Sequence, residues 1–189
     1  MAKENLSLEE KRTLLGLARS AIAAKLKLDS TWPQVQPSSG LQARSGAFVT
    51  LHKRGALRGC IGRFTATSPL TATVEEMALA SAFEDPRFPP LSPAELEEVD
   101  LEISVLTPMR RIHNVEEIEV GRHGIYIVQG FHRGVLLPQV ATENKWDRQT
   151  FLEHTCFKAG LGRDCWRDQK TEIHVFSAEV FGEKELRLK

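Results

Sequence analysis

The sequence predicts an α+β fold, in which a mainly antiparallel sheet is flanked by helices. Helix and strand patterns are mixed irregularly along the 189 residues, and several strand patterns are separated only by short turn signals. A doubly wound parallel sheet would instead need a long crossover between its strands. The length suits a single domain over residues 1–189, or one domain with a small lobe.

The expected helices carry clear start and stop signals. A capping box at Ser7–Glu10 precedes apolar residues at three- and four-residue spacing, which is typical of an amphipathic helix. Ser68-Pro69 predicts the start of a second helix, and the capping box Ser92–Glu95 that of a short third one. Asp147 is the expected N-cap of a helix that ends at Gly160.

The expected strands include two hairpins. Ala47–Leu51 and Leu57–Ile61 flank turn residues, and Gly124–Val128 and Val135–Leu137 flank a glycine-bounded tip. Apolar and polar residues alternate over 99–105, which predicts a half-buried strand. The last strand is expected over 173–180.

Composition narrows the class of protein. Lysine plus arginine and aspartate plus glutamate both number 25, which argues against nucleic-acid binding, since that usually needs a basic surplus. The N-terminus has no apolar signal core, and no apolar run approaches the roughly 20 residues that span a bilayer. Three cysteines are too few for a secreted disulfide framework. We therefore expect a cytoplasmic protein with no membrane partner.

The unusual segment is Leu57–Gly62, which reads Leu-Arg-Gly-Cys-Ile-Gly. Alternate side chains of a strand point to opposite faces, so Leu57 and Ile61 should be buried while Arg58 and Cys60 point into a cleft. The small residues beside the cysteine should leave it open to approach and line a binding site: Gly59 and Gly62.

A cation next to a thiol favours the thiolate, which is the nucleophilic form of cysteine. Cys60 is thus a candidate nucleophile or redox thiol, and Arg58 a candidate catalytic residue beside it. We expect Cys60 to be the most reactive of the three thiols, with a reactivity that depends on Arg58. The alternative of equal weight is a small buried cysteine in a tight strand.

The segment Leu57–Gly62 resembles the hallmark hexapeptide of the AMMECR domain family. Further matching segments follow the family order: Gly46–Leu51, Asp85–Phe88, Glu102–Pro108, Leu137–Ala141, Trp146-Asp147, Phe151-Leu152 and Cys156–Leu161. The resemblance covers about residues 8–183. It implies an α+β fold with a larger and a smaller subdomain, and a hexapeptide that lines the cleft between them. The bacterial form is similar to protein A of the AmmeMemoRadiSam system, found alongside a Memo-type protein and a radical SAM protein. No established activity comes with the family.

The sequence gives less support for a functional role of the other candidate residues. Asp85 and Arg87 lie in a rigid proline loop and could bind substrate, although a structural salt bridge is slightly favoured. Glu102, on the polar face of its strand, and His123, at a strand entrance, are candidates for proton transfer. Each could equally face solvent.

Further binding candidates follow the hexapeptide or come from the resemblance. Hydroxyls at Thr65 and Thr67 could hold an anion, although an ordinary helix cap is the better explanation. Cys156 is expected in the core, and the resemblance makes it a candidate partner of Cys60 and Lys158 a candidate cation. Cys165 stands where the family usually has a small residue. No spacing of metal ligands or cofactor motif is present, so no metal and no cofactor are expected.

Two hypotheses remain. The first is an enzyme that uses Cys60 on a small anionic substrate, with His123 or Glu102 moving the proton. The second is a non-catalytic module that binds a peptide or small anion and assists the Memo-type and radical SAM partners.

Overall fold

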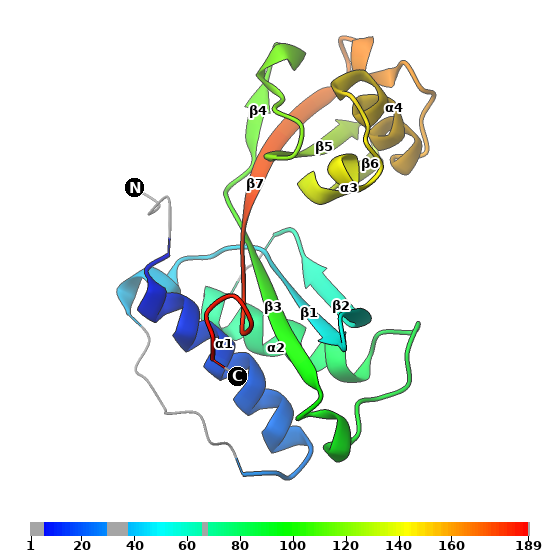
Figure 1. Cartoon of the computed structure of the whole chain (residues 1–189). Helices are drawn as coiled ribbons and strands as arrows, with labels where there is room; N and C mark the ends of the chain where they lie inside the picture. The colour runs from blue at the N-terminus through cyan, green and yellow to red at the C-terminus, as the bar shows by residue number, and fades with distance from the viewer. Residues whose placement is uncertain (1–5, 30–37, 66–67, 189) are drawn as a thin grey trace. The chain divides into compact units, whose positions relative to one another are not determined.

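The computed structural model describes residues 6–29, 38–65 and 68–188. The chain divides into two compact units (Figure 1). Unit 1 comprises Met1–Leu106 and Glu179–Lys189, and unit 2 comprises Thr107–Ala178. Each unit has an antiparallel sheet with helices packed on it, so the predicted α+β class is confirmed.

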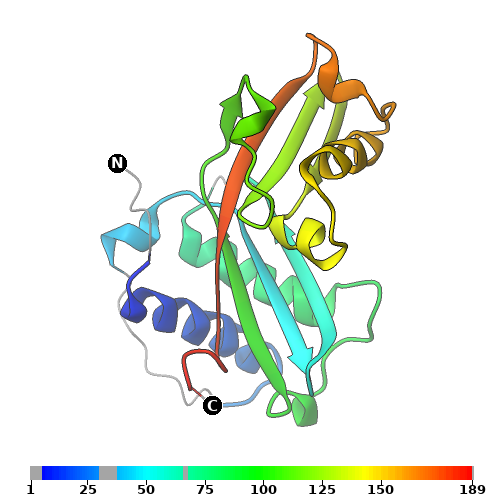
Figure 2. The same ribbon diagram turned by 45° about the horizontal axis from the view of Figure 1, so that its top comes forward.

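Unit 1 is built on neighbouring strands in the order β2-β1-β3, with β7 next to β3. Figure 2 shows β1 and β3 running side by side, with α1 and α2 behind them. Its elements are α1 (Leu8–Lys25), η1 (Ser39–Gln42), β1 (Ala47–Lys53), β2 (Ala56–Arg63), α2 (Leu70–Phe83), η2 (Pro93–Glu95), β3 (Val99–Leu106) and the end of β7 (Glu172–Gly182).

Both predicted capping boxes are present in unit 1. The Glu10 N–H donates to Ser7 Oγ, and the Ser7 N–H donates to Glu10 Oε2, so two free donors at the start of α1 are satisfied. The second box begins η2. Helix α2 starts one residue later than predicted, because Pro69 and not Ser68 is its N-cap.

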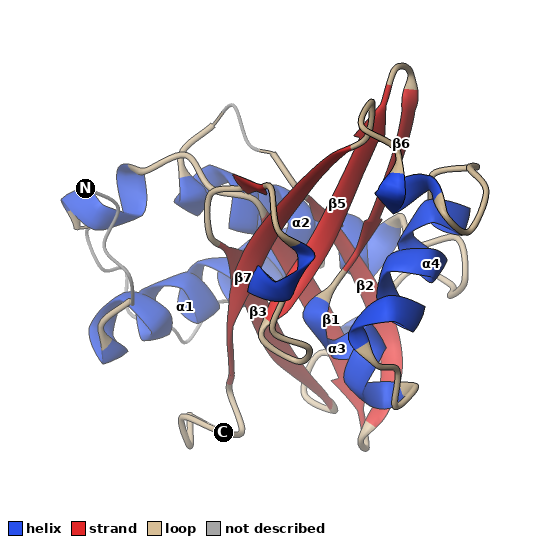
Figure 3. Ribbon diagram, turned by 90° about the horizontal axis from the view of Figure 1, so that it is seen from above, coloured by secondary structure: helices blue, strands red, loops and turns tan. Residues whose placement is uncertain are grey.

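The core of unit 1 lies between the two helices and one face of the sheet (Figure 3). The helix stripes and the inward strand positions meet there: Leu14, Leu15, Ile22, Val49, Leu51, Val74, Ala78, Leu101 and Ile103. Because every second residue of β1 enters this core, Phe48, Thr50 and His52 lie on the opposite face. We call that opposite face, made by β1, β2 and β3, the Cys60 face.

A buried ion pair links three segments of unit 1. Arg19 on α1 donates from Nε and Nη2 to the carboxylate of Glu183, at 2.5 and 2.6 Å. Arg19 also donates to the carbonyls of Leu96 and Val99, and Glu183 accepts from the Leu101 N–H. Glu183 is fully buried and Arg19 is 7% exposed. The pair therefore joins α1, β3 and the C-terminal segment through charge-assisted hydrogen bonds.

Unit 2 has neighbouring strands in the order β4-β7-β5-β6, all antiparallel. Asp147 accepts from the Thr150 N–H at 2.8 Å, which confirms it as the N-cap of α4. Helix α4 packs its buried face on the sheet around Phe151 and Leu152. The elements are β4 (Arg110–Ile112), η3 (Val115–Glu117), β5 (His123–Gln129), β6 (His132–Leu136), α3 (Pro138–Glu143), α4 (Arg148–Lys158), η4 (Cys165–Arg167) and the start of β7.

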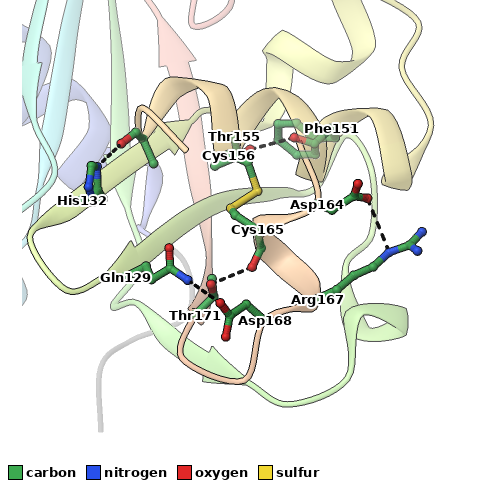
Figure 4. The surroundings of a disulfide bond; sticks show 11 residues. Gln129, His132, Phe151, Thr155, Cys156, Asp164, Cys165, Arg167, Asp168 and Thr171 are labelled. Carbon is green, nitrogen blue, oxygen red and sulfur yellow. Dashed lines mark hydrogen bonds and ion pairs between the residues drawn. A yellow bond between two sulfur atoms is a disulfide. The ribbon is translucent and has the colours of Figure 1, made fainter. Parts of the chain in front are cut away.

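Two of the three cysteines form a disulfide, which the sequence did not predict. Cys156 on α4 is bonded to Cys165 on η4 (Figure 4). Cys156 is fully buried, so its predicted place in the core is confirmed. Its expected role as a partner of Cys60 is wrong, because its sulfur is bonded to Cys165. The chain reverses after Gly160, at φ +72°, and brings η4 back against α4.

Among the described residues, no helix is both long enough and apolar enough to span a lipid bilayer.

Candidate functional site

Strand β2 carries a β-bulge at the predicted site. Leu51 pairs with Gly59 and His52 pairs with Leu57, so Arg58 is left without a partner on β1. The bulge breaks the alternation on which the prediction for Leu57 and Arg58 rested. Leu57 is 43% exposed and Arg58 only 8% exposed, which is the reverse of what was expected. Ile61 is partly buried against the core.

Arg58 holds the proline loop to the edge of β2. Its Nε and Nη2 donate to the two carboxylate oxygens of Glu95, at 3.1 and 3.2 Å, and Nη2 also donates to the Pro89 carbonyl. This guanidinium, aided by hydrogen bonds from Ser92 and Lys53, lowers the pKa of Glu95 to about 2. The charge of Arg58 is thus compensated by Glu95, which corrects the expectation that it serves the thiol.

Cys60 is half-buried and is the one cysteine of the three that is not in a disulfide. The Thr50 hydroxyl donates to its Sγ at 3.3 Å. The Cys60 N–H donates to Asp85 Oδ2 at 2.9 Å, and its carbonyl accepts from Arg87 Nη2 at 3.1 Å. The thiol therefore has a hydroxyl partner, while two charged side chains hold its backbone.

Asp85 and Arg87 form the ion pair that was slightly favoured for this loop. Arg87 donates from Nε to Oδ1 at 2.9 Å and from Nη2 to Oδ2 at 2.7 Å. The Arg87 side chain, followed by the N–H groups of Cys60 and Arg87, holds the pKa of the buried Asp85 carboxyl well below its usual range. A carboxylate this acidic is a poor general base near neutral pH.

Arg87 is the cation beside Cys60. Its hydrogen bonds and ion pair with Asp85 raise its pKa above the usual value. Half of the Arg87 side chain is exposed, at 53%. It can therefore bind a ligand while it holds Asp85 and the Cys60 carbonyl. The sequence predicts Arg58 as the cation beside the Cys60 thiol. In the structure, Arg87 of the proline loop is that cation.

The two glycines of the hexapeptide have structural roles. A Cβ on Gly59 would lie 2.2 Å from the Ser81 carbonyl oxygen, so the absence of a side chain lets α2 approach β2. A Cβ on Gly62 would lie 2.2 Å from Cγ of Phe48. Both spaces are filled by the protein itself, which corrects the expectation that they leave Cys60 open.

The sheet register aligns three polar residues across the Cys60 face. Thr50 of β1 is opposite Cys60 on one side and opposite Glu102 of β3 on the other. Directly paired residues have Cβ atoms about 5 Å apart. The side chain of the half-buried Glu102 makes no hydrogen bond or ion pair with the other described residues. It is therefore available for proton transfer along this row.

His52 also lies on the Cys60 face, two residues after Thr50 and opposite Asp100 of β3. Neither Thr50 nor His52 is predicted from the sequence as a site residue. Alternation along β1 could have placed them on one face, but only the register brings that face to Cys60.

Other predicted residues lie elsewhere. His123 begins β5 of unit 2, where its Nδ1 accepts from the Glu119 N–H at 3.1 Å. Lys158 is exposed at the last residue of α4, and Thr65 is exposed in the bend after β2. Thr67 lies outside the described residues. Within the described ranges, no three His, Cys, Asp or Glu side chains converge to hold a metal ion.

Acid should weaken the attachment of the proline loop. The pKa of Glu95 is about 2 in the folded protein, below the ordinary 4.5, so its carboxylate stabilises the fold at pH values above about 4.5. That contribution disappears as the pH falls from about 4.5 to about 2. We expect Glu95→Gln to lower the free energy of unfolding by about 2 kcal/mol at pH 7 and by much less at pH 2.

Urea unfolding at pH 7, 4.5, 3 and 2 measures this dependence. Glu116→Gln is the control, since Glu116 is 70% exposed and its ion pair with Arg148 is at the surface. An equal loss of stability for Glu95→Gln at pH 7 and pH 2 would contradict the assigned role of the ionised carboxylate.

Comparison with known proteins decides the family. A sequence model of the AMMECR1 family matches residues 15–181, which include the hexapeptide, the proline loop and β3. The chain belongs to the AMMECR1 family. The resemblance seen in Leu57–Gly62 is thereby confirmed.

The AMMECR1 relatives include archaeal proteins of similar length. Protein MK0488 of Methanopyrus kandleri is 44% identical over 96% of this chain and 92% of its own length. A protein of Methanothermobacter thermautotrophicus is also 44% identical, over 94% and 96%. The crystal structure of the uncharacterised protein PH0010 from Pyrococcus horikoshii is similar with a TM-score of 0.79 and 40% identity, over 96% of this chain and 95% of that one.

Proposed function

We propose that this AMMECR1 protein is an acyl-transfer enzyme in which Cys60 is the nucleophile and the substrate is a small carboxylate. The observation that carries the proposal is the hydrogen bond from the Thr50 hydroxyl to Cys60 Sγ, on the face where Glu102 also lies. A thiol paired with a hydroxyl and a nearby carboxylate can lose its proton and attack an electrophilic carbon. Because Cys156 and Cys165 are bonded to each other, a nucleophilic role of Cys60 is favoured over a dithiol redox role.

In the first step, Cys60 Sγ forms a bond to the carbonyl carbon of the substrate. The thiol proton passes through water to Glu102, while the Thr50 hydroxyl, which donates to Sγ, stabilises the thiolate. The bond to the leaving group then breaks, and Glu102 returns the proton to that group. In the second step water attacks the thioester and gives a proton to Glu102. Glu102 then passes this proton to Sγ as the C–S bond breaks, which regenerates the thiol. Proton transfer by His123, the other candidate for this role, stays a prediction.

Arg87 would bind the carboxylate of the substrate. Its Nε and Nη2 are engaged by Asp85 and the Cys60 carbonyl, which keeps the guanidinium oriented, and half of its side chain is exposed. A fixed, partly exposed guanidinium is well suited to a carboxylate. Arg87, and not Arg58, would therefore be the cation that binds the small anionic substrate expected from the sequence.

A non-catalytic binding module is the second candidate function. One observation favours it: the N–H of Cys60 donates to Asp85, so it cannot stabilise an oxyanion formed at this residue. The same Arg87 and Cys60 face would then bind a peptide or small anion without turnover. In either case we propose, on the family resemblance, that a Memo-type protein and a radical SAM protein are the partners. The cytoplasmic location stays a prediction.

The acyl-transfer proposal is tested with p-nitrophenyl esters of succinate, which bears a carboxylate, and of butyrate, which does not. We expect a burst of nitrophenolate equal to the protein concentration, and one succinyl group on Cys60 by intact-protein mass spectrometry. Cys60→Ser should abolish the burst. Glu102→Gln should slow acylation by about 100-fold, the lower range for loss of a general base.

Arg87→Gln should remove the preference for succinate over butyrate. Arg133→Gln is a matched control, because Arg133 is an exposed arginine on β6 of unit 2. If Cys60→Ser hydrolyses both esters at the rate of the unmodified protein, the acyl-transfer proposal is wrong. Succinate protection against thermal unfolding that is lost in Arg87→Gln would then support the binding module.

A further inference from the structure

An aromatic side chain lies at one end of the Cys60 face. The Phe48 ring lies directly over Gly62, since a Cβ on Gly62 would be 2.2 Å from its Cγ and 2.3 Å from its Cδ1. Phe64 packs edge-on against this ring, with a centroid distance of 5.0 Å. The two rings form an apolar wall at this end of the Cys60 face, whereas the other end carries His52 and Asp100.

The wall is within reach of a group attached to the thiol. Phe48 precedes Thr50 by two residues and Gly62 follows Cys60 by two residues, so both ring and thiol lie on the same face. Two residues span about 6.6 Å along a strand. An acyl group of a few carbon atoms bonded to Cys60 Sγ would therefore reach the ring that covers Gly62.

Phe48 is not part of the buried core of unit 1. Its neighbours along β1, Ala47 and Val49, are fully buried, while Phe48 is only half-buried. A half-buried aromatic ring beside a nucleophile can bury further surface when a ligand binds, which stabilises the complex.

We propose that Phe48 is the specificity-determining residue of the Cys60 site, and that it selects an acyl group with an aromatic or branched apolar side chain. This inference rests on the proposed function. The substrate class is then a carboxylate-bearing acyl compound whose anionic end binds Arg87 and whose apolar end packs on Phe48. Gly62 has no side chain because the ring needs that space, so Gly62 and Phe48 act together.

Three alkylating probes separate the two ends of the site. Iodoacetamide is small and neutral, iodoacetate is small and anionic, and N-benzyl iodoacetamide is aromatic and neutral. In each reaction the C–S bond forms as the C–I bond breaks, iodide leaves, and the thiol proton passes to buffer. Rates of Cys60 alkylation are measured by mass spectrometry without reductant, and each rate is divided by that for iodoacetamide with the same variant.

We expect Phe48→Ala to lower the benzyl ratio about tenfold, the low end for loss of contacts in an apolar pocket, and to leave the iodoacetate ratio unchanged. Arg87→Gln should lower the iodoacetate ratio and leave the benzyl ratio unchanged. Phe48→Leu keeps an apolar side chain at the site, should give an intermediate benzyl ratio, and serves if the alanine variant does not fold. Phe131→Ala is the matched control, because Phe131 is 99% exposed on unit 2.

An unchanged benzyl ratio in both Phe48 variants would overturn the inference. The same rates distinguish a failure of this inference from a failure of the proposed function. If Cys60 reacts no faster than a free cysteine peptide with any probe, the proposal that Cys60 is the nucleophile is wrong. If Cys60 reacts faster but the benzyl ratio does not change in the Phe48 variants, the nucleophile proposal stands and only the inferred apolar substrate class is wrong.

Discussion

Replacing Glu183 by alanine should lower the free energy of unfolding by about 4 kcal/mol, the largest single effect that we expect in this protein. The change leaves the Arg19 guanidinium buried without its counter-charge, and removes the acceptor of the Leu101 N–H. Both groups are buried in unit 1, so water cannot replace the lost carboxylate without opening the structure.

Urea unfolding at pH 7 measures this effect, with Glu117→Ala as the control. Glu117 pairs with Arg110 on the surface, and both side chains are more than a third exposed. Its loss should change the free energy of unfolding far less than the loss of Glu183. The double variant Arg19→Met/Glu183→Leu should recover most of the stability, because no unpaired charge remains. A double variant no more stable than Glu183→Ala would show that packing, and not the unpaired charge, sets the cost.

Gly59→Ala should be the second most damaging change, with a loss of about 3 kcal/mol. The added Cβ would lie 2.2 Å from the Ser81 carbonyl oxygen, which is helix backbone and cannot rotate away. Strand β2 or α2 must then shift. The Ser81 hydroxyl, which accepts from the Ile61 N–H and donates to the Val49 carbonyl, would be displaced with them.

The control for this change is Gly162→Ala, because a Cβ at Gly162 meets nothing within 4 Å. Thermal and urea unfolding should show that variant within about 0.5 kcal/mol of the unmodified protein. Alkylation of Cys60 by iodoacetamide gives a second readout, since a shifted β2 changes the contact between Thr50 and Cys60. Gly59→Ala with unchanged stability would mean that α2 does not press on β2 at this point.

Local signals predicted most of the fold. The capping boxes at Ser7–Glu10 and Ser92–Glu95, the N-cap at Asp147 and the alternation in β3 all depend on residues close together in the chain. The hexapeptide likewise led to the family and to Cys60, because its residue types are unusual in themselves. These features need no knowledge of which distant segments meet.

The candidate site was predicted only in part. Cys60 and Glu102 do share one face, on adjacent sides of Thr50. Arg58 was assigned to the thiol because strict alternation was assumed through residue 58, and a bulge is a property of the pairing between two strands. Thr50 and His52 were missed for the same reason: their distance from Cys60 depends on the register of β1 against β2.

By itself, the sequence determined the α+β class, the family and a reactive-cysteine candidate, since these follow from local periodicity and a specific motif. Only the tertiary structure decided that Arg87, and not Arg58, is the cation beside Cys60, and that Cys156 is bonded to Cys165. The physical reason is common to both. Each contact joins segments whose approach is set by packing and cross-strand hydrogen bonds, and those forces leave no signal in the spacing of the residues that they bring together.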